Sequence, residues 1–133
     1  MNTISKNILF YITIVENNQA DHTFLRQMIH KVVPQAIVDS VYSDEEAAQY
    51  FSTCPTVPHL IFLDQDMSAN SGKTIDLIKQ INGLEKVPII YLHENNSQKT
   101  NLAKRNADHF YLKPFKAQDL LNIVGSVNSK WLA

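Results

Sequence analysis

Short apolar runs alternate along the chain with segments whose apolar residues recur every three or four positions. The apolar runs cover residues 8–15, 36–41, 60–63, 87–92 and 109–112. Their lengths, and their β-branched and aromatic residues, are typical of buried strands. The intervening segments have a helical period, so the order is (βα)5. This alternation predicts an α/β fold, a parallel sheet with right-handed crossovers and helices on both faces.

The first two helical segments carry their own start and stop signals. The first lies near residues 20–33, and Pro34 ends it. Its expected apolar face consists of Phe24, Leu25, Met28, Ile29 and Val32. Ser43 and Glu46 form a capping-box sequence, in which the hydroxyl accepts from an early amide and the glutamate reaches back. A second helix is therefore predicted from this cap to about Thr53.

Three more helices are expected further along the chain. The third follows a polar loop at 65–71, and Gly83 is placed to form a left-handed cap after its end. Its inward residues are predicted to be Ile75, Ile78 and Ile81. The fourth, at about 98–106, is polar almost all round and should pack loosely. The last is expected over about 117–130.

Length and composition favour one globular domain over residues 1–133. The chain is 44% hydrophobic and 19% charged, which suits a folded core. Its net charge of −1 and pI near 6.5 give no basic footprint for nucleic acid. The single cysteine, Cys54, has no intrachain partner for a disulfide. The run at 8–15 is too short to span a bilayer, so we expect a cytoplasmic protein without membrane contact.

Polar residues follow four of the five predicted strands at the point where each strand ends. They are Glu16 with Asn17, Asp64, His93, and Lys113 before Pro114. In an open parallel sheet, sites form outside the carboxyl ends of the strands, where the strand order reverses. If the strands are neighbours, two carboxylates, an amide, an imidazole and an ammonium converge on one site.

Each of these residues suits phosphoryl chemistry, although each also has a plain structural reading. Asp64 can attack phosphorus and form an acyl phosphate, or it can cap the next turn. Glu16 beside it would make a hard-oxygen site for Mg²⁺, or it can start a solvated loop. Lys113 can stabilise charge on a phosphoryl group, or it can be an exposed lysine. His93 can donate a hydrogen bond, act as a base, or cap a loop.

The motifs, taken in order and at their spacing, resemble the receiver domain of bacterial two-component response regulators. The resemblance covers essentially the whole chain. Its carriers are residues 14–18, 60–64 with Gly72 after them, 87–90, 107–108 and 113–115. Each of these motifs is weak by itself, and their combination is specific.

The resemblance implies a fold, a reaction and a set of site residues. The fold is a flavodoxin-like, doubly wound parallel sheet of five strands in the order 2-1-3-4-5. A histidine kinase or histidine phosphotransfer protein would pass a phosphoryl group to Asp64, and a stand-alone receiver would then dock to a downstream protein. The implied Mg²⁺ ligands are Glu16, Asn17, Asp64 and the backbone of Asp66. The implied phosphoryl-binding residues are Lys113 and His93, and the implied switch residues are His93 and Phe110.

Three positions depart from the family pattern. Asn17 stands where the family has an aspartate that ligates Mg²⁺, so one formal negative charge is missing. His93 stands where a threonine or serine hydroxyl binds the phosphoryl group, and Ser68 stands where proline is usual. Mg²⁺ affinity should fall with the lost charge. Asp66 adds some negative charge to the edge of the site.

Two other functions compete with the phosphorylated receiver. Asn17 and His93 also fit a pseudo-receiver, a binding module of the same fold that works without phosphorylation. Residues 60–66 additionally resemble the nucleophile motif of haloacid-dehalogenase-type phosphatases, with Asp64 as nucleophile and Asp66 as acid and base. That family has an acidic pair after a later strand, and no such pair is present here. We therefore expect no enzymatic activity beyond self-phosphorylation and self-dephosphorylation at Asp64.

Overall fold

A computed structural model describes residues 10–53, 56–64, 71–93, 109–112, 118–119 and 121–122. Its centre is a parallel five-stranded sheet. The strands are β1 (Phe10–Val15), β2 (Ala36–Val41), β3 (Leu60–Asp64), β4 (Ile89–His93) and β5 (His109–Leu112). Their order is β2-β1-β3-β4-β5, which confirms the flavodoxin-like doubly wound arrangement.

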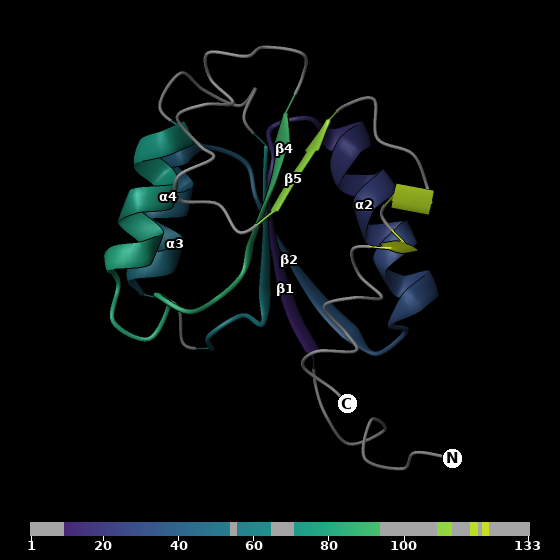
Figure 1. The fold of residues 1–133 in the computed structure, drawn as a ribbon, viewed down its shortest axis with the longest axis horizontal. Coiled ribbons are helices and arrows are strands. Elements are labelled where there is room, and N and C mark those ends of the chain that lie inside the picture. Colours follow the sequence, from purple (N-terminus) through teal and green to yellow (C-terminus); the bar gives the residue numbers. More distant parts are fainter. Residues whose placement is uncertain are drawn as a thin grey trace.

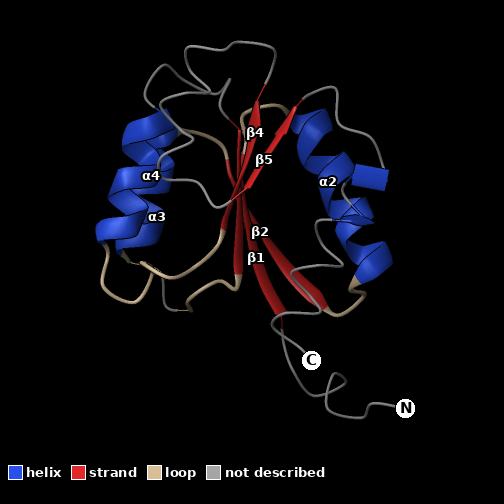
Figure 2. Cartoon of the chain, in the orientation of Figure 1, coloured by secondary structure: helices blue, strands red, loops and turns tan. Residues whose placement is uncertain are grey.

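The helices lie in two layers, one on each face of the sheet. Figure 1 shows α2 (Gln19–Val32) on one side, and α3 (Asp44–Ser52) with α4 (Ser71–Gln80) on the other. Figure 2 shows the sheet nearly edge-on between these layers, with the arrowheads of β4 and β5 pointing the same way. This is the arrangement that right-handed crossovers between parallel strands produce. The expected helix at 98–106 lies outside the described residues, and of the last expected helix only 118–119 and 121–122 are described, all four helical.

The sheet divides the apolar core into two clusters. Alternate residues of each central strand point to opposite faces, so β1 and β3 contribute to both clusters. The α2 side contains Phe10, Ile12, Ile14, Leu25, Met28, Ile29, Val33, Ala36, Leu60, Phe62, Ile90 and Leu92. The α3 and α4 side contains Val15, Val41, Ala47, Phe51, Ile61, Leu63, Ile78, Leu84, Val87, Ile89 and Tyr91. This double burial explains why the central strands read as continuous apolar runs.

The helix caps follow the side-chain chemistry of the sequence. The Ser43 hydroxyl accepts a hydrogen bond from the Glu46 amide at 3.0 Å. The Glu46 carboxylate reaches back to the Tyr42 amide at 2.6 Å, one residue before the amide that the standard capping box uses. After α4, Gly83 has φ of +96°, a left-handed conformation that suits glycine. The predicted starts and stops of these helices are therefore confirmed to within a residue or two.

Two details of the helix predictions were wrong. Phe24 fits the apolar period of α2, yet it is 37% exposed. The side of the helix that faces the core is formed by Leu25, Met28 and Ile29. Ile81 lies one residue beyond the end of α4 rather than within it, although it packs against the core as predicted. The apolar period correctly located both helices and overestimated the width of the buried face of α2.

His59 joins the start of β3 to the start of β1. Its backbone amide donates to the Tyr11 carbonyl at 2.7 Å, and its Nδ1 accepts from the Tyr11 amide at 3.0 Å. An imidazole nitrogen can accept only when it carries no proton, so this geometry requires the neutral tautomer with its proton on Nε2. Burial also lowers the pKa of His59, which favours the same neutral form.

The His59→Asn protein should lose less stability in mild acid than the wild type. Because the folded pKa of His59 is lowered, the unfolded chain takes up its proton first as the pH falls below the ordinary histidine value. Stability is therefore lost between that value and the lower folded one. Asparagine keeps an acceptor for the Tyr11 amide and does not titrate. Urea unfolding at a series of pH values measures the difference, and parallel pH profiles for the two proteins would contradict it.

The edge strand β2 carries a carboxylate at its middle. Asp39 is exposed, and its Oδ2 accepts a hydrogen bond from the Tyr50 hydroxyl of α3 at 2.7 Å. The same hydroxyl lies 3.5 Å from Oγ1 of Thr13, a buried residue of β1. Tyr50 thus connects α3 to the two strands beneath it.

Candidate functional site at the carboxyl ends of the strands

The site begins at Glu16, the first residue after β1. Its backbone amide donates to the Val41 carbonyl at 2.9 Å and continues the β1–β2 ladder by one residue. Its side chain is fully buried, at 0% exposure. The carboxylate Oε2 accepts a hydrogen bond from the Asn18 amide at 3.1 Å. A buried carboxylate needs such donors, so the turn after β1 helps to hold the Glu16 side chain in place.

The next two residues have different roles in this turn. Asn17 is exposed. Asn18 is the N-cap of α2, and its Oδ1 accepts from the Asp21 amide at 3.0 Å. The cap fixes where α2 starts and therefore how closely the chain turns over Glu16. Asn17 takes no part in this cap.

Strand register brings the predicted site residues to the same edge of the sheet. Val15 pairs with Leu63, so Glu16 and Asp64 are the next residues on two adjacent central strands. Asp64 itself pairs with Leu92, and His93 follows directly as the last residue of β4. The backbones of all three positions therefore lie at the carboxyl edge.

The remaining predicted residues lie on or beyond β5 and β3. Phe110 is in β5, where its Cα pairs with that of Tyr91. His93 pairs with Leu112, the residue that precedes Lys113 in the sequence. Lys113 and Asp66 lie outside the described residues. Their roles, and the phosphoryl, metal and switch roles of the other positions, stay predictions.

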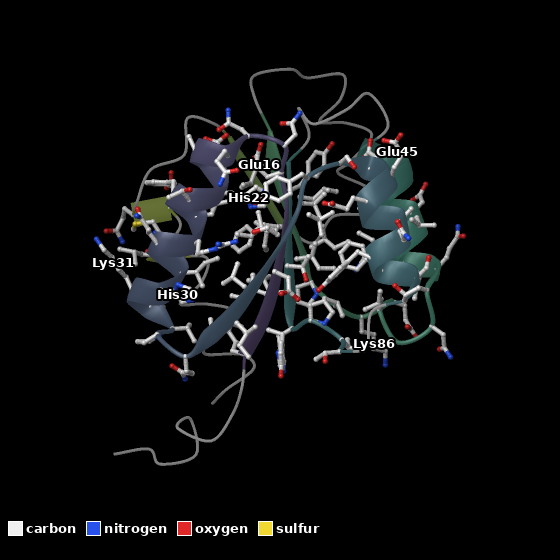
Figure 3. All side chains as sticks on the ribbon, turned by 180° about the vertical axis from the view of Figure 1, so that it is seen from behind. Glu16, His22, His30, Lys31, Glu45 and Lys86 are labelled. Atoms are coloured by element: carbon white, nitrogen blue, oxygen red, sulfur yellow. The ribbon has the colours of Figure 1, made fainter. Side chains whose placement is uncertain are left out.

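One buried polar residue near this edge was assigned no role from the sequence. His22 of α2 is 1% exposed, and its Nε2 lies 3.3 Å from the Val41 carbonyl. Its ring centroid is 4.4 Å from that of Tyr42. Figure 3 shows Glu16 and His22 toward one end of the molecule, and His30 toward the other end of α2. The signal in the sequence was its position three residues before Leu25, on the apolar face of the helix.

The surroundings of His22 favour its neutral form. Burial is the largest influence and lowers its pKa, and the positive charge of Arg26 acts in the same direction. The backbones of Glu16 and Val41, and the charge of Asp21, oppose these influences in part. Among the described residues, Nδ1 of His22 has no hydrogen-bond partner. Nε2 must be the donor because a carbonyl only accepts, so the neutral ring carries its proton on Nε2.

The sequence matches the response regulator receiver domain over residues 12–125. The chain belongs to this family. Receiver domains of this kind work in two-component systems with histidine kinases or phosphotransfer proteins, and they commonly bind Mg²⁺ at their active site. No curated protein matches the sequence at a significant level.

Solved structures of receiver domains share this fold. The phosphorylated cyanobacterial phytochrome response regulator RcpA is 20% identical, with a TM-score of 0.77 over 95% of this chain and 96% of that one. The receiver domain of a signal transduction histidine kinase from Syntrophus aciditrophicus is 23% identical, with a TM-score of 0.78 over 92% of each chain. The receiver domain of the sensor histidine kinase PA1611 from Pseudomonas aeruginosa, solved with a magnesium ion in its active-site cleft, is 21% identical, with a TM-score of 0.77 over 92% of this chain and 99% of that one.

The described residues contain neither a metal-binding cluster nor a membrane-spanning helix. No group of three or more His, Cys, Asp or Glu side chains there could hold a metal ion. In the same part of the receiver domain, no helix is long and apolar enough to cross a membrane.

Proposed function

We propose that the chain acts as a receiver in a phosphorelay and accepts a phosphoryl group on Asp64. The donor is a histidine kinase or a histidine phosphotransfer protein, and the phosphorylated domain signals by docking to a downstream protein. Its own chemistry is limited to taking up and losing the phosphoryl group. Membership of the receiver family supports this proposal.

The register of the two central strands carries the proposal. Glu16 and Asp64 occupy neighbouring positions at the carboxyl edge, where α/β proteins of this topology bind ligands. Position 64 is thus adjacent in register to a second acidic position, at residue 16. This register supports Asp64 as the acceptor and Glu16 as a residue that would help to hold a cation.

The transfer step needs only the Asp64 carboxylate and a phosphohistidine donor. A carboxylate oxygen forms a bond to phosphorus while the bond from phosphorus to the donor's imidazole nitrogen breaks. The electron pair of that broken bond stays on the imidazole. Lys113 would balance charge on the phosphoryl oxygens, and His93 would donate a hydrogen bond to one of them. Water attack on the acyl phosphate later releases inorganic phosphate and restores the carboxylate.

The oxygen atoms proposed for this site are the kind of ligand that Mg²⁺ prefers, but together they carry less negative charge than a set with aspartate at position 17. Glu16, Asn17, Asp64 and the backbone carbonyl of Asp66 would hold the cation, which prefers oxygen ligands and retains several waters. When bound, Mg²⁺ supplies positive charge that stabilises the transferring phosphoryl group. The neutral amide of Asn17 makes this set weaker than one with an aspartate at the same position.

Intact-mass measurement tests the proposal. Purified protein is incubated with acetyl phosphate or phosphoramidate, with and without Mg²⁺. We expect the mass of one phosphoryl group to appear, faster when Mg²⁺ is present. Absence of any adduct with both donors would refute the proposal and favour the pseudo-receiver, for which the missing charge at Asn17 is the supporting observation. Hydrolysis of p-nitrophenyl phosphate would instead support a phosphatase.

A further inference from the structure

The carbonyl of Val41 receives hydrogen bonds from two different elements. The Glu16 amide donates to it at 2.9 Å from the end of β1, and the His22 Nε2 lies 3.3 Å away on α2. A carbonyl oxygen has two lone pairs, so both bonds form at once. One acceptor at the end of β2 thus connects the residue that starts the site to a buried imidazole.

His22 is also tied to the turn that holds the Glu16 carboxylate. Its backbone amide donates to the Asn18 carbonyl at 3.0 Å in the first turn of α2. The Asn18 amide in turn donates to Oε2 of Glu16 at 3.1 Å. The His22 ring therefore connects to Glu16 through the Val41 carbonyl, while its backbone places it in the helical turn that contains Asn18.

The burial of His22 makes its ring a rigid part of this connection. The side chain is 1% exposed and packs against the Tyr42 ring, with centroids 4.4 Å apart. Nothing in the apolar period of α2 requires a polar ring here, because an aliphatic residue would fill the same face. The ring instead serves the one hydrogen bond that its Nε2 makes.

We infer that His22 is a positioning residue for Glu16, holding the turn after β1 in the geometry that presents this carboxylate to a divalent cation. The inference rests on the proposed function only for the identity of the ligand. Groups that orient a metal ligand typically change metal affinity by 10- to 100-fold when they are lost. Removal of the His22 donor should therefore weaken Mg²⁺ binding by roughly tenfold.

Two amide substitutions at position 22 distinguish the effect of losing the Nε2 hydrogen-bond donor from the effect of changing the size of the side chain. In His22→Gln the amide nitrogen occupies the position of Nε2 and reaches the Val41 carbonyl. In His22→Asn the nitrogen corresponds to Nδ1 and falls short. Both variants bury one neutral amide, so a difference between them reports the hydrogen bond. His30→Asn is the matched control, because the His30 Nε2 lies 2.9 Å from the Ala36 carbonyl at the opposite end of β2.

Hydrogen exchange of the Glu16 and Asn18 amides in metal-free protein is the first measurement. We expect faster exchange in His22→Asn, near wild-type exchange in His22→Gln, and no change at these amides in His30→Asn. Calorimetric titration with Mg²⁺ should show the roughly tenfold loss in His22→Asn and its recovery in His22→Gln. Equal behaviour of the two His22 variants, or the same effect from His30→Asn, would overturn the inference.

The wild-type protein provides a test that needs no variant. Ring-nitrogen chemical shifts, measured well above the ordinary histidine pKa, should show the proton of His22 on Nε2. A proton on Nδ1 would remove the proposed hydrogen bond and sink the inference even if His22→Asn failed to fold. The exchange and tautomer measurements involve neither Mg²⁺ nor a phosphodonor, so they stand apart from any failure of the proposed phosphorylation.

Discussion

We expect the Asp64→Asn protein to take up no phosphoryl group from any donor that labels the wild-type chain. The amide of asparagine lacks the anionic oxygen that attacks phosphorus, and the carboxylate that follows the neighbouring strand, Glu16, is fully buried. Asp64 ends a central strand with neighbours on both sides, so its backbone position is fixed by the sheet. The expected effect is complete loss of the adduct, measured by intact mass after acetyl phosphate with Mg²⁺.

The Asp76→Asn protein is the control for this experiment. Asp76 is an exposed aspartate of α4, and its replacement changes the net charge of the protein by the same amount. It should be labelled like the wild type. A persistent adduct on Asp64→Asn, or its loss from Asp76→Asn, would mean that another carboxylate is the acceptor.

The Asn17→Asp protein should bind Mg²⁺ more tightly than the wild type, by roughly tenfold. Asn17 is exposed and takes no part in the N-cap of α2, so an aspartate here replaces no described structural contact. The substitution adds the formal charge that the oxygen donors at this edge lack, and the affinity of such sites rises with ligand charge. Calorimetric titration gives the affinity, and the rate of labelling by acetyl phosphate should rise with it.

The Asn18→Asp protein distinguishes direct ligation of Mg²⁺ by residue 17 from the general electrostatic effect of one added negative charge. It adds the same charge one residue along, and aspartate caps a helix as well as asparagine does. The Asn18 side chain is already engaged with the Asp21 amide, so it should not ligate the cation. We expect only a small gain in affinity from this variant. Equal gains from the two substitutions would show that Asn17 acts through charge alone and is no ligand.

The fold was predictable because local signals in this chain agree with one another. β2 and β5 have the bounds that the apolar runs predicted, and the cap at Ser43 starts α3 where expected. The order of the strands in the sheet could not be predicted from periodicity. Periodicity gave a parallel sheet, and the order came only from the resemblance to receiver domains. Phe24 shows the remaining limit, since a period of three to four cannot define how wide a buried stripe is.

The sequence allowed us to predict which residues lie at the ends of the strands. It did not allow us to predict the hydrogen bonds that connect them to the rest of the protein. Placing Glu16 beside Asp64 requires only that β1 and β3 are neighbours in the observed register. The contribution of His22 depends on a carbonyl of a different strand, Val41, which no spacing rule connects to it. A single histidine in a helix can have many different roles, and only its tertiary contacts show which role it has.

The carboxylate of Asp39 also affects how copies of this protein meet. β2 ends the sheet, and an unpaired strand edge is a template on which a second molecule can extend the sheet. Strand addition at this edge would have to bury Asp39, an exposed charge already engaged with the Tyr50 hydroxyl. That desolvation opposes edge-to-edge stacking. Asp39, the acceptor of the Tyr50 hydroxyl, therefore disfavours the addition of a second molecule's strand to β2.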